Sequence, residues 1–62
     1  MKFTEDEKKY LDKLRKEYPN REIPTDEVVE KVLSKMKRNG SEEVIGDLII
    51  RTWDGIVEME LC

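Results

Sequence analysis

The sequence contains no histidine and a single cysteine, and these two absences limit the chemistry open to it. Histidine is the usual general base near neutral pH, and structural zinc sites are built from cysteine and histidine. The one thiol belongs to the last residue, Cys62, so no disulfide can form within the chain. We therefore expect a non-enzymatic protein with no catalytic site, no metal site and no cofactor, in a reducing compartment.

Long apolar runs are also missing. No stretch approaches the roughly 18 apolar residues of a membrane span, and the first residues lack the apolar core of a signal peptide. These absences predict a cytoplasmic protein that has no contact with membranes. With 62 residues and no repeat or linker, the chain has room for one core, so we expect a single small domain over residues 1–62.

Charge is abundant and unevenly distributed. Charged residues make up 44% of the chain, and the formal net charge is −3. Residues 1–40 carry a net charge of +2, whereas residues 41–62 carry −5, with Arg51 as their one basic residue. The C-terminal third therefore forms an acidic segment, which favours a basic partner over a polyanion.

Capping signals predict two helices in the first part of the chain. Thr4-Glu5-Asp6-Glu7 has the capping-box pattern, and Pro19 follows the last apolar position, so we expect a helix over about 4–18. Thr25 predicts the start of a second helix over about 25–39, with Gly40 as its left-handed cap. The short connection between them indicates an antiparallel helical pair.

Both predicted helices have an apolar stripe with helical spacing. In the first helix the stripe consists of Tyr10, Leu11, Leu14 and Tyr18, and in the second it consists of Val28, Val29, Val32, Leu33 and Met36. These stripes need an apolar surface to cover them.

Residues 41–62 have the pattern of a β-hairpin. Asp54-Gly55 is a strong signal for a type I′ turn, and it lies between predicted strands at about 48–53 and 56–61. Pairing Trp53 with Ile56 across this turn places Arg51 opposite Glu58. One face of the hairpin then carries the residues that cover the helices, which are Leu48, Ile50, Thr52, Val57, Met59 and Leu61. The predicted fold is α+β, with two antiparallel helices followed by a C-terminal hairpin.

The same residues also have a helical period. Ser41 can cap a helix whose apolar positions repeat at i, i+1, i+4 and i+5, giving a three-helix domain with residues 42–54 or 42–60 helical. In the shorter version, 56–61 remains a strand. Gly46, Gly55 and the many β-branched residues favour the hairpin over this alternative.

The outward face of the hairpin is the candidate binding site. It would carry Ile49, Arg51, Trp53, Ile56 and Glu58, and an exposed tryptophan with two isoleucines and an arginine has the composition of a binding hot spot. The alternative is that Trp53 belongs to the core. We expect a small interaction or regulatory protein, of the accessory or inhibitor type also found in mobile elements. It would bind a protein partner, or a second copy as a homodimer, through its acidic C-terminal segment.

A DNA-binding regulator is the alternative function. Lys31, Lys35 and Arg38 follow one another at i, i+4 and i+7 on the second predicted helix. The order of helix, short extended segment, helix and terminal hairpin resembles the layout of a winged helix, and that resemblance implies nucleic-acid binding. The acidic residues within 41–47, where a recognition helix would lie, and within the predicted wing would repel phosphates.

Overall fold

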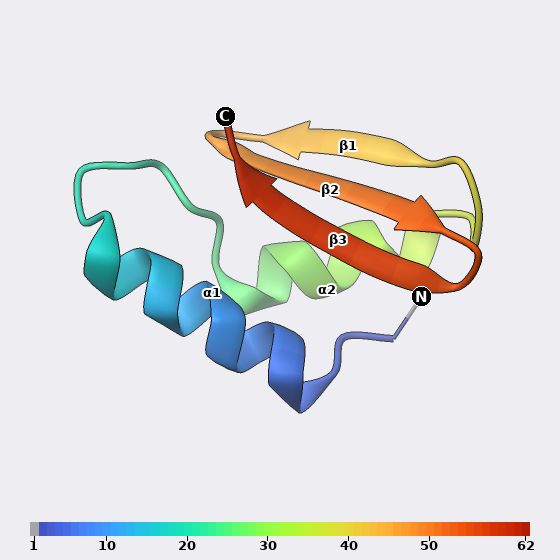
Figure 1. Ribbon diagram of the computed structural model, residues 1–62, viewed down its shortest axis with the longest axis horizontal. Helices are drawn as coiled ribbons and strands as arrows, with labels where there is room; N and C mark the ends of the chain where they lie inside the picture. The colour runs from blue at the N-terminus through green and yellow to red at the C-terminus, as the bar shows by residue number, and fades with distance from the viewer. Residues whose placement is uncertain (1) are drawn as a thin grey trace.

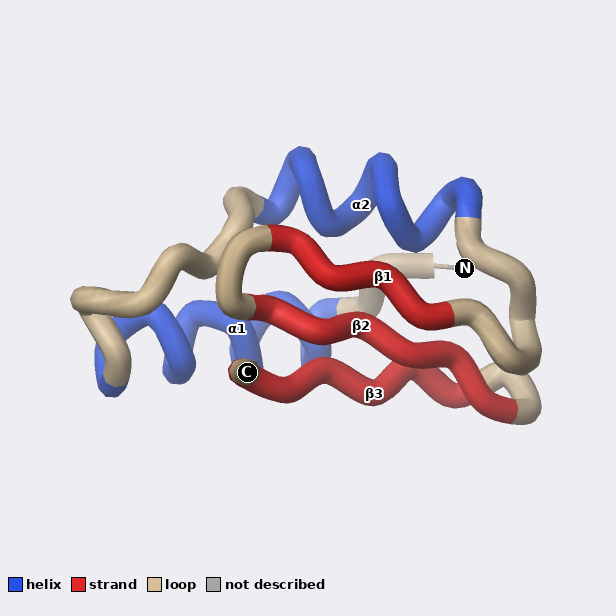
Figure 2. The backbone as a smooth tube through the Cα atoms, turned by 90° about the horizontal axis from the view of Figure 1, so that it is seen from above, coloured by secondary structure: helices blue, strands red, loops and turns tan. Residues whose placement is uncertain are grey.

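A computed structural model describes residues 2–62 and shows two helices packed on one face of a three-stranded antiparallel sheet (Figure 1). The elements are α1 (Glu5–Glu17), α2 (Asp26–Lys35), β1 (Glu42–Ile45), β2 (Leu48–Trp53) and β3 (Ile56–Leu61), and the strand order is β1-β2-β3. The two helices run in opposite directions, with α2 on the β1 side of the sheet and α1 on the β3 side (Figure 2). The predicted α+β fold is confirmed.

Helix α1 begins with the predicted capping box. The backbone N–H of Glu7 donates to Thr4 Oγ1 over 3.3 Å, and the backbone N–H of Thr4 donates to Glu7 Oε1 over 2.9 Å. Leu11 and Leu14 are buried against the sheet, whereas the two tyrosines of the predicted stripe are 42% and 46% exposed. The covered face of α1 is therefore narrower than the sequence predicted.

Helix α2 begins at the predicted Thr25 cap but ends at Lys35, so the predicted end near residue 39 was wrong. Met36 is extended, with ψ 146°, and its side chain is buried. Gly40 does have a positive φ of 79°, but it precedes β1 and donates its N–H to the carbonyl of Thr52 over 2.9 Å. The helix ends early because hydrogen bonds to β2 hold the chain after Met36 in a loop.

The predicted hairpin forms in the predicted register. Asp54 and Gly55 have φ values of 52° and 80°, the two positive values of a type I′ turn, and Trp53 pairs with Ile56. Arg51 lies opposite Glu58. The alternative with residues 42–54 or 42–60 helical is therefore wrong, because β-branched residues and a turn that needs positive φ outweigh the helical period.

Strand β1 is an addition that the sequence analysis did not predict. It pairs antiparallel with β2, and Ile45 and Leu48 form the pair beside the two-residue turn Gly46-Asp47. Gly46 has φ 59°, as the first turn residue of a type II′ hairpin does. A Gly-Asp pair between two apolar dipeptides is itself a hairpin signal, but the helical period of the same residues obscured it.

The core lies between the two layers. Its buried apolar side chains are Leu11, Leu14, Val29, Leu33, Met36, Leu48 and Ile50. Residues of β2 alternate strictly between buried and more exposed positions, and Val57, Met59 and Leu61 of β3 pack against the core from the same side of the sheet. This is the inward face that the hairpin register predicted.

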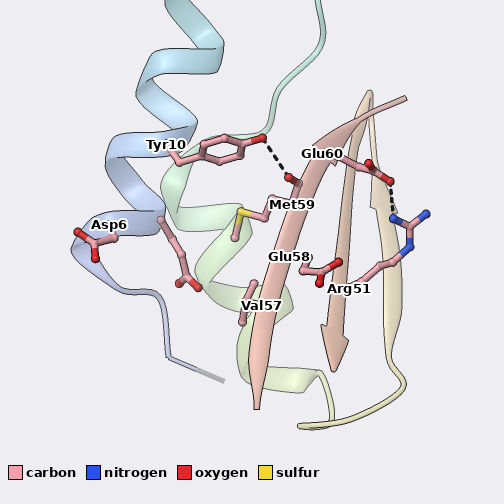
Figure 3. A pocket seen from close by; sticks show the side chains of 8 residues that line it. Asp6, Tyr10, Arg51, Val57, Glu58, Met59 and Glu60 are labelled. Atoms are coloured by element: carbon pink, nitrogen blue, oxygen red, sulfur yellow. Dashed lines mark hydrogen bonds and ion pairs between the residues drawn. The ribbon is translucent and has the colours of Figure 1, made fainter. Parts of the chain in front are cut away.

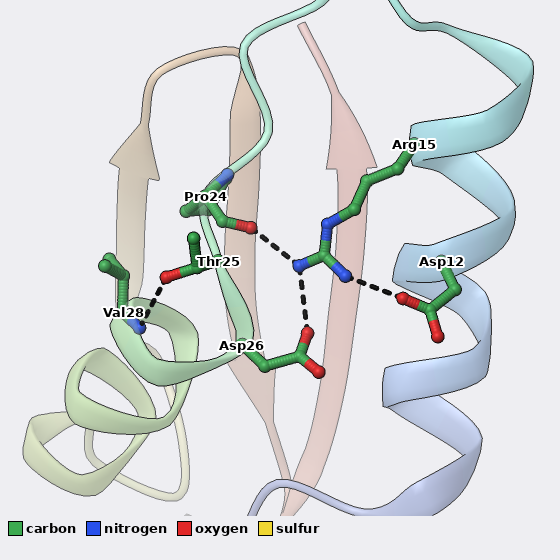
Figure 4. Close-up of polar contacts among 6 residues, drawn as sticks. All are labelled: Asp12, Arg15, Pro24, Thr25, Asp26 and Val28. Carbon is green, nitrogen blue, oxygen red and sulfur yellow. Dashed lines mark hydrogen bonds and ion pairs between the residues drawn. The ribbon is translucent and has the colours of Figure 1, made fainter.

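Arg15 joins the two helices at the edge of the core. Its Nη2 atom donates to the carbonyl of Pro24 over 2.7 Å and to Asp26 Oδ1 over 2.9 Å (Figure 4). Its Nη1 atom donates to Asp12 Oδ1 over 2.8 Å within α1. One guanidinium thus attaches the last turn of α1 to the first turn of α2.

Asp47 connects the turn between β1 and β2 to two other segments. Its Oδ2 atom accepts from the backbone N–H of Glu22 over 2.9 Å and from Arg21 Nε over 3.2 Å. Its backbone N–H donates to the carbonyl of Glu22, and its carbonyl accepts from the N–H of Cys62, each over 2.8 Å. The N–H of Glu22, and after it the Arg21 guanidinium, lowers the pKa of Asp47 below its usual value.

We predict that Gly46→Ala destabilises the fold much more than Gly40→Ala. Both glycines have positive φ, so alanine at either position costs about 1–2 kcal/mol of backbone strain. A Cβ at position 46 would also lie 2.7 Å from the carbonyl oxygen of Glu22, whereas a Cβ at position 40 meets no atom within 4 Å. Urea unfolding of both variants measures the difference, and equal losses of stability would show that the close approach of Glu22 is unimportant.

We predict that Asp47→Asn removes part of the acid sensitivity of the fold. Because folding lowers the pKa of Asp47, its carboxylate stabilises the protein above the unfolded pKa near 3.8, and this contribution disappears as pH falls through the lower folded pKa. The variant should be less stable than the parent at pH 7, and the difference should shrink as pH falls below the unfolded pKa near 3.8. Urea midpoints from pH 2 to 7 test this, with Asp54→Asn as the matched control. A constant difference at every pH would contradict the prediction.

Candidate protein-interaction surface

The face of the sheet that points away from the helices is the candidate site, and we call it the outer face. No other element of residues 2–62 covers it (Figure 1). Side chains from all three strands contribute to it, namely Glu42, Val44, Ile49, Arg51, Trp53, Ile56, Glu58 and Glu60. The structure therefore brings all five predicted interface residues together on one surface.

Apolar residues occupy both ends of the outer face. Trp53 and Ile56 form a cross-strand pair beside the Asp54-Gly55 turn, and they are 66% and 59% exposed. At the other end, Val44 of β1 is 57% exposed and pairs with the half-buried Ile49. Of the two positions that the sequence allowed for Trp53, the structure shows the exposed one.

Arg51 lies at the centre of the outer face between two carboxylates. Its Nε atom donates to Glu42 Oε2 over 2.7 Å, and its Nη1 atom donates to Glu60 Oε1. Although Glu58 is the register partner of Arg51 on β3, the guanidinium bonds to the other two glutamates. Arg51 is on the central strand and reaches acids on both sides, and these two, Glu60 first, raise its pKa above the usual value.

Three residues of the outer face were missed by the sequence analysis: Glu42, Val44 and Glu60. The first two belong to β1, and the Gly46-Asp47 hairpin signal was the feature that would have identified them. Glu60 follows from the alternation of β3, since it is two residues beyond Glu58.

The outer face carries a net charge of −2, from one arginine and three glutamates. Since Glu42 and Glu60 pair with Arg51, Glu58 is left with no ion-pair partner in the part of the chain that the structure describes. Glu58 and Trp53 line the same shallow hollow of about 460 Å³, beside Arg51. A cationic group entering this hollow would find both an aromatic side chain and an uncompensated carboxylate.

Within residues 2–62, no three side chains of metal-ligating type converge. No helix in that range has the length and apolar character to cross a membrane. The outer face is a surface of paired strands with apolar residues at both ends and charged residues at its centre.

The basic residues of the alternative function do not form one stripe. Lys31 and Lys35 are exposed on α2, but Arg38 lies beyond the helix end, where its carbonyl accepts from the N–H of Gly55 over 2.9 Å. Residues 42–45 form β1, so the position that a winged helix gives to its recognition helix is occupied by a strand. The order of two helices and a terminal hairpin is present, but no helix occupies residues 42–45, and DNA binding stays a prediction.

We predict that Trp53 is accessible to solvent in the free protein. It is the sole tryptophan, so its fluorescence reports this position alone. The emission maximum should lie close to that of the unfolded chain, and acrylamide should quench the folded protein nearly as well as the protein in guanidinium chloride. A blue-shifted, protected emission in dilute solution would contradict the exposed position.

The outer face thus combines the five predicted residues with three further ones on an uncovered sheet.

Comparison of the chain with protein-family models, curated proteins and solved structures gives no match.

Proposed function

We propose that this chain is a small, non-enzymatic interaction domain that binds a protein partner through the outer face of its sheet. The exposure of Trp53 on an ordered strand is the observation that carries the proposal. Burying a large apolar side chain contributes about 1.5–3 kcal/mol, and this gain is available to a complex because the fold itself does not use it.

The arrangement around Trp53 resembles that of a binding hot spot. Ile56 extends the apolar area, and the charged residues nearby form a polar border on one side. Because these side chains stand on paired strands, their backbone loses little freedom on association. Tryptophan and arginine are the residues most enriched among those that dominate binding energies.

Charge favours a different protein over a second copy of this chain. Two outer faces with a net charge of −2 each would repel when stacked, whereas a basic surface would be attracted. The domain would then act as an accessory or regulatory factor by occupying a basic surface of its partner.

The proposal predicts that Trp53→Ala strongly weakens partner capture and leaves the fold intact. The immobilised full chain is exposed to a lysate of the cells from which the sequence comes, beside Tyr18→Ala as control. Tyr18 is also an exposed aromatic residue, but it lies at the end of α1, away from the outer face. Wild type and Tyr18→Ala should retain the same protein, and Trp53→Ala should bind it roughly thirtyfold more weakly, as expected for a hot spot worth about 2 kcal/mol.

Circular dichroism of the three chains should be the same. If Trp53→Ala captures the same proteins as wild type with equal affinity, the outer face is not the binding surface. Sedimentation at increasing concentration provides a second check, because a stable homodimer would contradict a partner of different charge.

A further inference from the structure

Strand β3 is an edge strand of six residues, and no strand of residues 2–62 pairs with its outer side. In an antiparallel hairpin with a two-residue turn, the pair beside the turn exchanges hydrogen bonds, and bonded and non-bonded pairs alternate from there. Trp53 and Ile56 are that first pair. The register therefore directs the backbone N–H and C=O groups of Val57, Met59 and Leu61 toward the free edge.

A tyrosine of α1 occupies the middle of this edge. The hydroxyl of Tyr10 donates to the carbonyl of Met59 over 3.1 Å (Figure 3). The outward groups of Val57 and Leu61 have no such partner in the described residues. Tyr10 therefore satisfies one acceptor of an edge that otherwise remains available for pairing.

A shallow groove of about 440 Å³ runs between α1 and this edge. Val57, Met59 and Tyr10 give it apolar surface, and carboxylates from both elements line its walls (Figure 3). Asp6 of α1 and Glu58 of β3 contribute carboxylates that form no ion pair within residues 2–62. Arg51 also lines the groove, where it pairs with Glu60, and four carboxylates against this one arginine leave a net charge of −3. The groove combines unpaired backbone, apolar surface and net negative charge.

We propose that this groove binds an extended basic segment of the protein partner, which adds to the sheet as a fourth strand beside β3. Alternate side chains of such a segment would face the two sides of the sheet. Apolar residues would cover Val57 and Met59 on the helix side, and Lys or Arg residues would meet Glu58 on the outer face. The segment displaces the Tyr10 hydroxyl from Met59. This inference rests on the proposed function, because it names the chemistry of that partner.

A second copy of β3 is a poor occupant of the same edge. It would bring its own Glu58 and Glu60 onto the outer face beside those of the first copy, and like charges on neighbouring strands are destabilising. Charge complementarity therefore selects a basic strand and disfavours pairing of β3 with itself.

The test uses the full chain and a labelled peptide of alternating valine and lysine, seven residues long. Two control peptides accompany it, one with glutamate in place of lysine and one methylated at alternate backbone nitrogens. The valine-lysine peptide should bind in fluorescence anisotropy, and both controls should fail, because one has the wrong charge and the other cannot pair with a strand. Amide exchange should slow at Val57, Met59 and Leu61.

Three variants locate the site. Glu58→Gln should weaken peptide binding by up to about fivefold, the range of an exposed ion pair, whereas Glu30→Gln on α2 should leave it unchanged. Tyr10→Phe should tighten binding by roughly fivefold, because no hydroxyl then competes for the carbonyl of Met59.

The inference is overturned if the peptide does not bind at millimolar concentration, or if the methylated peptide binds equally well. Equal effects of Glu58→Gln and Glu30→Gln, or weaker binding to Tyr10→Phe, would also overturn it. Trp53 does not line this groove, so Trp53→Ala should bind the peptide normally. Trp53-dependent capture without peptide binding would reject this inference alone, and the reverse result would reject the outer-face proposal.

Discussion

The register of β2 against β3 is the constraint on which the rest of the structure depends. The Asp54-Gly55 turn, with positive φ at both residues, aligns Trp53 with Ile56 and so fixes every later pair. A shift of one residue would move each side chain of one strand to the opposite face of the sheet. Leu48 and Ile50 would then lie outside, and Ile49 and Arg51 would point into the core. One turn therefore determines both what the helices cover and what remains exposed.

Covering only one face of the sheet has a clear physical origin. Each of the two helices presents a narrow apolar stripe, which is enough to cover one face of the sheet, and both helices lie on that face (Figure 1). The opposite face is then exposed to solvent, and its centre is occupied by charged residues. There Arg51 pairs with Glu42 and Glu60 across all three strands. Against this background the exposed apolar residues at the two ends of the face are exceptions, and Trp53 is the largest and most exposed of them. A glutamate or threonine at these positions would suit an exposed strand. The proposed interaction surface follows from this contrast.

Much of the fold was predictable because local signals agreed with the tertiary structure. The Thr4 and Thr25 caps, the hairpin turn and the inward residues of β2 and β3 all depend on short-range chemistry, and each is confirmed. The end of α2 and the pairing of Arg51 were not predictable in this way. The end of α2 depends on the loop before β1, where hydrogen bonds to β2 outweigh the helical preference of the sequence. The pairing of Arg51 depends in part on Glu42 of β1. Because β1 was not predicted, Glu42, one of the two ion-pair partners of Arg51, was absent from the predicted site.

The carboxylates of β3 belong to both proposed binding regions, the outer face of the sheet and the groove beside the edge of β3. Glu58 and Glu60 point to the outer face, yet they also border the groove beside the free edge of β3. An edge strand rich in acids resists pairing with its own copy, which is a known way to keep exposed edges from aggregating. The same charges lower the energy of a basic strand at that position. Glu58, whose register partner Arg51 is already bound to two other acids, is the carboxylate left to pair with such a strand. Protection against self-association and the proposed selection of a basic partner would thus have one physical cause.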